Sequence, residues 1–136
     1  MKTLKNLLMV LSLLLAFNLS AQSEKTFIKI LPTEQSIVSV DLPGDYVTKN
    51  WNEDFIKITA TVTSNNFSDD FLGKLLSAGR YDFKSSIEDG KQIISMPKLL
   101  SKVTIKGVLL EESFSFEIEV PHGYVIQNSK SDNLLK

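Results

Sequence analysis

The chain has 136 residues, the length of one domain, and it contains one histidine, one arginine and no cysteine. These counts exclude disulfide-stapled folds, cysteine-ligated metal sites, cysteine nucleophiles and every metal motif that needs two histidines. Its 15 basic and 16 acidic side chains give a formal net charge of −1, which argues against the basic surface typical of nucleic-acid-binding domains.

The first 21 residues have the three-part pattern of an export signal. Lys2 and Lys5 precede an apolar run at residues 7–17, and the small residue Ala21 stands before the polar Gln22. The run is about half as long as the ~20 residues that span a bilayer as a helix. We therefore expect a signal peptide that is cleaved between Ala21 and Gln22, and no membrane span in the mature protein. The exported chain would then reside in the periplasm, on the cell surface or in the medium.

The remaining sequence predicts one β-rich domain over residues 22–128 and a polar tail over residues 129–136. The clearest strand signal is residues 55–63, where apolar and polar side chains alternate with the period of two of a half-buried strand. Its inward face would consist of Ile56, Ile58, Ala60 and Val62, and its outward face of Lys57, Thr59 and Thr61. Further strands are expected at residues 27–31, 37–42, 46–48, 80–87, 91–96, 103–110, 114–120 and 124–128. We expect the polar residues 22–26 to be loose.

Several connections between these strands have recognisable signals. Asp89-Gly90 between two strand-like runs predicts a two-residue hairpin. Glu111-Glu112 is expected to form a solvated hairpin loop. Three lysines, Lys98, Lys102 and Lys106, would share the outer face of a strand, where lysine opposes edge-to-edge aggregation.

One segment, at about residues 68–78, predicts a short helix instead of a strand. Ser68 is a suitable N-cap, and Asp69 and Asp70 lie in the first turn, where the helix dipole favours negative charge. Gly79 suits the left-handed position that follows a helix. Phe67, before the cap, is expected to pack on Leu72. A helix this short is unstable alone, so we expect its apolar stripe to lie against the sheet (Phe71, Leu72, Leu75 and Leu76).

Two stretches 78 residues apart resemble each other: residues 38–50 and residues 116–128. In both, an alternating strand ends at a proline, a glycine follows, and a second strand opens with a tyrosine. The turn residues are Pro43 and Gly44 in the first stretch and Pro121 and Gly123 in the second, and the tyrosines are Tyr46 and Tyr124. Proline fixes φ and glycine permits positive φ, so the pattern predicts two similar turns, stacked in the two halves of the chain.

Four stretches resemble the adhesin-like β-domains of Bacteroidetes-type bacteria, a family of adhesin heads and domains of unknown function. They are residues 38–44, Trp51 with residues 55–59, residues 79–81 and residues 116–123. The resemblance covers most of residues 27–128, and the leader ending in Ser-Ala-Gln is also similar to leaders of that bacterial group. It implies export and a stacked sheet, either β-solenoid-like or a sandwich, and it transfers no catalytic residue.

The aromatic residues supply the candidate binding site. Trp51 and Tyr46 could form a platform on which a carbohydrate ring stacks, and Tyr124 is a further candidate. The alternative is that these rings cover the core and the corners of the sheet.

Candidate catalytic residues are few. His122 lies in a Pro-His-Gly turn, and no serine stands in a Gly-x-Ser-x-Gly context that would make it a nucleophile. Glu117 and Glu119 would lie on one strand face ~6.8 Å apart, a separation that a glycosidase could use. Acids that alternate with apolar residues are also the ordinary outer face of an amphipathic strand.

A cation site is the remaining chemical option. Asp69 and Asp70 could bind a cation together with Asn65 or Asn66, but calcium prefers six or more oxygens from spaced acids. Stabilisation of the helix start accounts for both aspartates. We therefore expect no catalytic residue, no metal site and no cofactor.

The sequence as a whole predicts an exported, mainly-β protein with one short helix, whose strands form a stacked antiparallel, β-solenoid-like or sandwich sheet. We expect a non-catalytic binding or structural module of the cell envelope, adhesin-like, whose partner is an envelope protein or a glycan and not a nucleic acid. Two alternatives remain: a small envelope glycan hydrolase that uses Glu117 and Glu119 or His122, and a small-ligand carrier with a pocket under the helix.

Overall fold

The computed structural model describes residues 22–129 of the chain. The predicted leader with Ala21, and residues 130–136 of the predicted polar tail, lie outside the described residues.

Within residues 22–129 the chain forms ten strands, one α-helix and one short 3-10 helix, so the predicted mainly-β fold with a single short helix is confirmed. The elements in chain order are β1 (Ser23–Pro32), β2 (Ile37–Asp41), β3 (Asp45–Trp51), β4 (Phe55–Ser64), α2 (Asp69–Ser77), β5 (Lys84–Glu88), β6 (Lys91–Ser95), η1 (Pro97–Leu100), β7 (Thr104–Ile105), β8 (Val108–Leu109), β9 (Glu112–Pro121) and β10 (Val125–Asn128).

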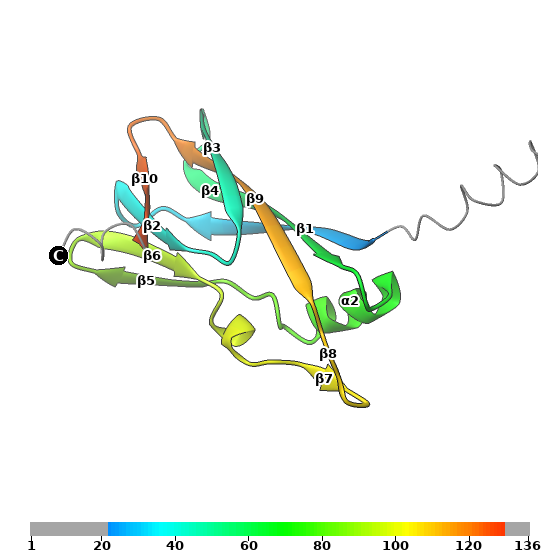
Figure 1. Cartoon of the computed structure of the whole chain (residues 1–136). Helices are drawn as coiled ribbons and strands as arrows, with labels where there is room; N and C mark the ends of the chain where they lie inside the picture. Colours follow the sequence, from blue (N-terminus) through cyan, green and yellow to red (C-terminus); the bar gives the residue numbers. More distant parts are fainter. Residues whose placement is uncertain (1–21, 130–136) are drawn as a thin grey trace, which may run out of the picture.

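Eight of these strands form two four-stranded sheets that pack against each other (Figure 1). Sheet A has the order β1-β4-β9-β3, and sheet B has the order β10-β2-β6-β5. Both are mixed, because β3 runs parallel to β9 in sheet A, and β10, β2 and β6 run parallel in sheet B. Of the architectures that the sequence leaves open, the structure is therefore a sandwich, and its strand pairing is mixed instead of wholly antiparallel.

The core lies between the two sheets. Strand β4 shows the predicted alternation, with Ile56, Ile58, Ala60 and Val62 fully buried. The other buried apolar side chains of the strands are Leu31, Phe116, Ile118 and Val120 from sheet A and Val38, Val40 and Ile94 from sheet B. One polar side chain, Gln92, is also fully buried in sheet B.

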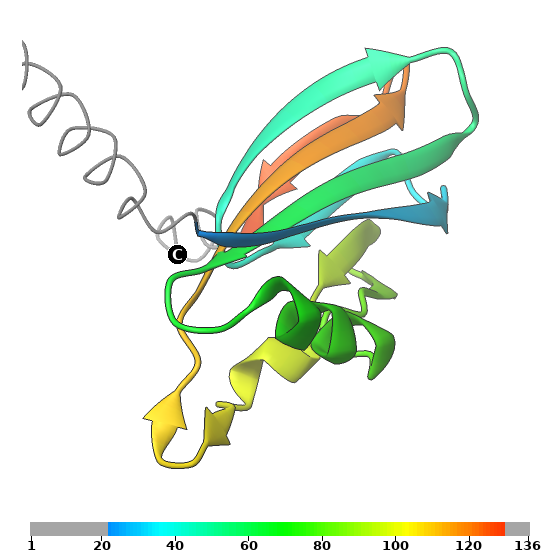
Figure 2. The same cartoon turned by 90° about the vertical axis from the view of Figure 1, so that its right-hand side faces the viewer.

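The two sheets differ in strand length, and this difference explains the position of the helix. Strands β1, β4 and β9 each have 10 residues, whereas those of sheet B have 5 or 4. About half of the inner face of sheet A therefore extends past sheet B. Leu72 of α2 and Tyr81, 0% and 2% exposed, cover that half. Figure 2 shows α2 beneath the long strands.

The ends of α2 are those that the sequence predicts. The Ser68 hydroxyl accepts a hydrogen bond of 3.2 Å from the Phe71 backbone N–H. Gly79 has φ +87°. The backbone N–H groups of Gly79 and Arg80 donate to the backbone oxygens of Leu76 and Leu75, and this pair of hydrogen bonds is typical of a helix that ends at a glycine. Phe67 stacks on Phe71, with ring centroids 4.8 Å apart, where the sequence pattern had indicated Leu72.

The two similar stretches, residues 38–50 and 116–128, lie beside each other. Each contributes one strand to each sheet: β2 pairs with β10 in sheet B, and β3 pairs with β9 in sheet A. The predicted stacking of their turns is wrong. The turn at Pro43 lies beside the first residue of β3, whereas the turn that begins at Pro121 lies beside its last residue, Trp51. The turns therefore lie at opposite ends of the sandwich (Figure 1).

The two turn glycines also serve different purposes. Gly123 has φ +87°, as the pattern predicts. Gly44 does not have a positive φ; instead a Cβ at Gly44 would lie 2.1 Å from the backbone oxygen of Phe114. Gly44 is thus required for the close approach of two chain segments. The predicted hairpin at Asp89-Gly90 is confirmed, with φ of 52° and 73° between the paired strands β5 and β6.

Three local predictions are wrong. Residues 22–26 are not loose, since β1 begins at Ser23 and pairs with the far end of β4. The predicted strand at residues 80–87 begins only at Lys84, because the chain from Arg80 first crosses the inner face of sheet A. The predicted strand at residues 103–110 is a small hairpin, β7–β8, which turns at Lys106-Gly107 with φ of 50° and 79°.

The lysine prediction fails for the same reason. Lys98 lies in η1, Lys102 in the following loop and Lys106 in the hairpin turn, so these three residues do not share one strand face.

Candidate functional site

The outer face of sheet A carries a group of aligned hydroxyl side chains. On this face the register places Thr61 between Thr26 of β1 and Ser115 of β9, and Thr63 opposite Ser113. The Thr26 and Thr61 hydroxyl oxygens are 3.2 Å apart. We name this surface the hydroxyl face and define it by Thr26, Thr59, Thr61, Thr63, Ser113 and Ser115. Alternation along three adjacent strands produces it, because the odd-numbered positions of β4 and β9 point away from the core.

A shallow depression lies on the hydroxyl face next to β3. Asp45 and Val47 of β3, Thr59 and Thr61 of β4, and Ser115 and Glu117 of β9 line it. Its lining combines hydroxyl groups, which donate and accept, with carboxylates, which accept when ionised. The exposed side chain of Val47, 60% accessible, adds an apolar border. Such a lining suits a ligand that itself presents many hydroxyl groups.

Charged side chains continue this face toward the end of β9. Lys49 and Glu117 form an exposed ion pair of 2.8 Å. The hydrogen bond and the charge of Lys49 lower the pKa of Glu117, and Glu117 in turn raises the pKa of Lys49. A glycosidase acid needs a carboxyl whose pKa is raised so that it is protonated, and Glu117 has the opposite shift. Glu119 lies opposite both Lys49 and Lys57 in the register.

Trp51 lies at the far end of the same face, where β3 ends beside Pro121. Its ring is fixed from three sides. The indole N–H donates to the Phe55 backbone oxygen at 2.9 Å. The Phe55 ring packs edge-on against the indole with ring centroids 4.9 Å apart, and the Lys57 ammonium lies over the indole, 5.9 Å from its centroid. The partly exposed ring is therefore held in one orientation, which lowers the entropic cost of using it in binding.

The other two candidate aromatics do not join Trp51. Tyr46 lies five residues before Trp51 on β3, so the two side chains point to opposite faces. Tyr46 and Tyr124 are partly buried and pack against the core. The structure thus separates the predicted platform: Trp51 lies on the outer face, and the tyrosines cover the core between the sheets.

The remaining candidates have structural partners. His122 is exposed in its turn, with its Nε2 atom 3.0 Å from the side-chain oxygen of Asn52. Asp69 accepts a hydrogen bond of 2.8 Å from the Glu24 backbone N–H, which ties α2 to β1. Among residues 22–129 there is no group of three His, Asp or Glu side chains that could hold a metal ion. Asn66 contacts the backbone of Leu109 and Glu111.

The predicted carrier needs a pocket under the helix. That space is filled by side chains, since Leu72 is fully buried there and Phe67, Phe71, Leu75 and Leu76 pack against the core.

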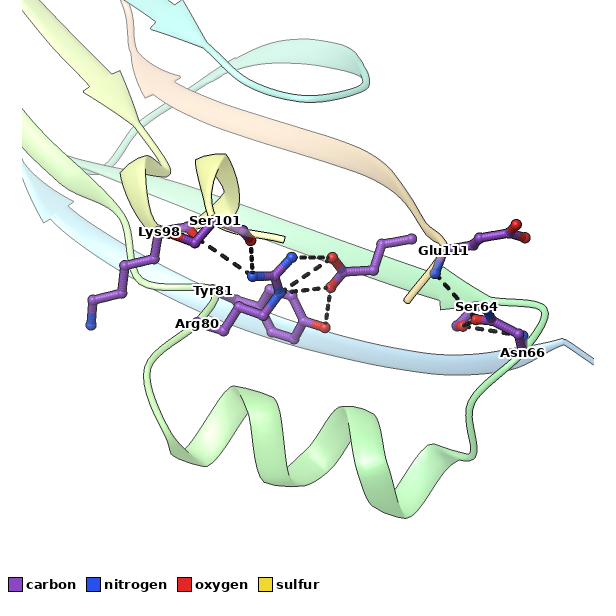
Figure 3. A network of polar contacts seen from close by, with 8 residues as sticks. Ser64, Asn66, Arg80, Tyr81, Lys98, Ser101 and Glu111 are labelled. Atoms are coloured by element: carbon purple, nitrogen blue, oxygen red, sulfur yellow. Dashed lines mark hydrogen bonds and ion pairs between the residues drawn. The ribbon is translucent and has the colours of Figure 1, made fainter. Parts of the chain in front are cut away.

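A polar cluster that the sequence pattern did not predict lies at the start of β9 (Figure 3). The Arg80 guanidinium forms a 2.6 Å ion pair with Glu112, and both side chains are nearly buried. The Tyr81 hydroxyl donates to the same carboxylate at 2.5 Å, and Arg80 also donates to the Ser101 backbone oxygen at 2.8 Å. Burial and the bond to Glu112 raise the pKa of Tyr81, and the bond to Glu112 raises that of Arg80.

This cluster corrects the prediction for Glu111-Glu112. Glu111 is exposed, but Glu112 is the first inward residue of β9. The sequence contains a signal for this, because alternate residues of a strand face the same side, and Glu112 is two and four residues before the inward Phe114 and Phe116. The polar groups of this cluster form hydrogen bonds with one another, and they connect the chain after α2, the loop after η1 and β9. The cluster therefore has a structural role, and the hydroxyl face is the better candidate for binding.

Comparison of the chain with protein-family models, with curated proteins and with solved structures finds no match. In the described part of the chain, no helix is long and apolar enough to cross a membrane.

Proposed function

We propose that the protein is an exported, non-catalytic binding module of the cell envelope, adhesin-like in its role, and that it binds an extended glycan along the outer face of sheet A. The N-terminal sequence pattern supports export. The binding proposal depends on one observation: a row of hydroxyl groups in strand register shares its face with an immobilised tryptophan at the end of β3.

The chemistry of this face matches that of a sugar chain. Threonine and serine hydroxyls can exchange hydrogen bonds with sugar hydroxyls, and the carboxylates of Asp45 and Glu117 can accept them. The flat, partly apolar face of an indole ring suits the apolar side of a sugar ring. Both kinds of group already occupy fixed positions on a sheet, so little order has to be imposed when the ligand binds.

The spacing favours an oligomer over a single sugar. Trp51 lies opposite Pro121 and the Thr61 row lies opposite Ser115, six residues earlier on β9. At about 3.4 Å per residue the two ends of the site are ~20 Å apart. A monosaccharide would contact one end only, so affinity should rise with chain length until both ends are occupied.

The test uses the chain that begins at Gln22, soluble oligomers of β-1,4-linked N-acetylglucosamine of increasing length, and purified peptidoglycan sacculi. Calorimetry with the oligomers and co-sedimentation with the sacculi measure binding. We expect binding that strengthens with oligomer length, and at least tenfold weaker binding for Trp51→Ala and for Thr61→Val. Thr48→Val is the matched control, because Thr48 is an exposed residue of β3 on the opposite face from Trp51.

Binding that does not depend on length, or that Thr48→Val weakens as much as Trp51→Ala, would contradict this site. Release of new reducing ends from the sacculi, abolished by Glu119→Gln, would instead support the hydrolase alternative and overturn the non-catalytic assignment.

A further inference from the structure

We infer that the projection formed by residues 97–110 is a docking surface for an anionic lipid bilayer. It consists of η1, the following loop and the β7–β8 hairpin, and we name it the basic tip. Figures 1 and 2 show it extending away from the two sheets, on the side of α2. It lies on other elements than the hydroxyl face, so this inference does not depend on glycan binding.

The first argument is the exposure of its apolar side chains. Leu100 is 88% exposed, and Val108 and Leu109 are 50% and 45% exposed. Single exposed apolar residues are common on protein surfaces, whereas neighbouring ones indicate a contact surface. Pro43 and Leu99 line both of the depressions next to the tip. Leu100 lines one depression and Leu109 the other, so apolar side chains lie near one another across the tip.

The second argument is charge. The tip contains Lys98, Lys102 and Lys106 and no acidic residue, whereas the rest of residues 22–129 carries eight basic and fifteen acidic side chains. Lys98 forms an exposed ion pair with Asp82, and Lys102 lines the same depression as Leu109. The rest of the described chain has a net negative charge, which an anionic surface repels, so the tip is the part that we expect to approach such a surface.

The third argument is rigidity at the base. The Arg80 guanidinium donates to the backbone oxygens of Ser101 and Lys98, and the same group is paired with Glu112. The hairpin closes through a backbone hydrogen bond of 2.9 Å from Leu110 to Val103. These hydrogen bonds hold the leucines and lysines of the tip in place relative to the sandwich. Binding therefore does not carry the entropic cost of ordering a flexible loop.

A bilayer fits these features better than a protein partner. Leucine side chains enter the boundary between headgroups and acyl chains, while lysines around them contact anionic headgroups. Leu100 projects into solvent instead of lying in an enclosed cleft, which suits a soft surface that closes around it. Because the lysine contribution is electrostatic, added salt should weaken it.

The test measures co-sedimentation with vesicles of phosphatidylcholine containing 30 mol% phosphatidylglycerol, compared with pure phosphatidylcholine vesicles. The chain begins at Gln22, because the apolar leader would itself bind lipid; the core residues, Leu31 to Val120, all remain in it. A cooperative thermal transition first shows that each variant is folded.

We expect at least tenfold stronger binding to the anionic vesicles, and a loss of at least tenfold in Leu100→Ser/Leu109→Ser. Lys102→Gln/Lys106→Gln should remove most of the preference for phosphatidylglycerol and most of the salt dependence. Ile87→Ser is the matched control, since Ile87 is 52% exposed on β5, and it should bind as the parent chain does.

Equal binding to both vesicles, or parent-like binding by the double leucine variant, would overturn the inference. So would a parent chain that ignores vesicles but self-associates through the same leucines in gel filtration, because the tip would then be a protein interface.

Discussion

Arg80 and Glu112 are 32 positions apart in the sequence, yet their side chains form a 2.6 Å ion pair with only 11% and 7% of their surface exposed. Arg80 follows α2, and Glu112 begins β9. Their contact closes the end of the sandwich that sheet B does not reach. The same arginine donates a hydrogen bond to the Ser101 backbone oxygen at the base of the basic tip. One buried pair therefore connects the end of α2, strand β9 of sheet A and the tip.

Loss of one partner of this pair should be costly. Arg80→Met leaves the Glu112 carboxylate buried without its cation, and we expect the free energy of unfolding to fall by about 3–5 kcal/mol. Urea unfolding followed by circular dichroism measures it. Lys98→Met is the control, because the exposed Lys98–Asp82 pair should contribute less than about 1 kcal/mol. If the two variants lose the same stability, the Arg80 pair is not a buried anchor.

The double variant Arg80→Met/Glu112→Met extends this prediction. Replacing both charges with apolar side chains leaves no unpaired charge, so the double variant should be more stable than Arg80→Met alone. A double variant that is less stable than both single variants would contradict this expectation. It would show that Arg80 and Glu112 each stabilise the fold through their other partners, the Ser101 backbone oxygen and the Tyr81 hydroxyl.

Tyr81 should make stability sensitive to alkaline pH. Burial and the bond to Glu112 raise its pKa above the ordinary value of 10.0. In the unfolded chain Tyr81 loses its proton near pH 10, while in the folded protein it stays protonated. The stabilisation is therefore complete below pH 10 and falls by about 1.4 kcal/mol per pH unit above it, until the folded pKa is reached.

Tyr81→Phe isolates this effect. We expect the variant to be less stable than the parent at pH 8, since it lacks the hydrogen bond to Glu112, and the difference should shrink as the pH rises from 10 to 11. Urea midpoints of both proteins at each pH give the measurement. A difference that is constant with pH would mean that Tyr81 titrates alike in both states.

Three glycines should respond differently to alanine. Gly44→Ala places a Cβ 2.1 Å from a backbone oxygen, so overpacking should cost about 1–3 kcal/mol or more. Gly90→Ala meets no atom, but its φ of +73° should cost about 1–2 kcal/mol. In Gly73→Ala the new Cβ has an ordinary contact at 3.5 Å, and better helix propensity should stabilise α2 by up to ~1 kcal/mol. We expect the denaturation midpoint to be highest for Gly73→Ala, followed by the parent chain, Gly90→Ala and Gly44→Ala. A Gly44→Ala variant with the midpoint of the parent chain would contradict this reasoning.

Gln92 should be essential for the connection between the two sheets. Its amide accepts a hydrogen bond from the Glu34 backbone N–H and donates to the Pro32 backbone oxygen and the Ser85 hydroxyl. Gln92→Leu removes all three bonds in a fully buried site, and we expect it to cost at least ~2 kcal/mol. Ser85→Ala removes one bond and should cost less. Hydrogen exchange at the Glu34 amide should accelerate in Gln92→Leu only; unchanged exchange would show that this bond does not hold the connection.

The local sequence was sufficient for the elements whose signals lie within a few residues. The alternation in β4, the Ser68 cap, the glycine that ends α2 and the Asp89-Gly90 hairpin each depend on backbone geometry and on contacts between near neighbours. These features follow from the side chains themselves, so the mainly-β fold with one short helix could be predicted. The hydroxyl positions Thr59 and Thr61 were likewise assigned to the outward face of their strand.

Only the tertiary structure decided which segments meet. No local pattern shows that β3 and β9 run in parallel, that Tyr46 and Trp51 therefore face opposite sides of the sandwich, or that Thr26, Thr61 and Ser115 form one row. The burial of Glu112 also depends on Arg80 and Tyr81, which arrive from a distant part of the chain. Local signals arise from backbone preferences over a few residues, whereas pairing and burial depend on how unequal strand lengths are covered, and that is a property of the whole packed domain.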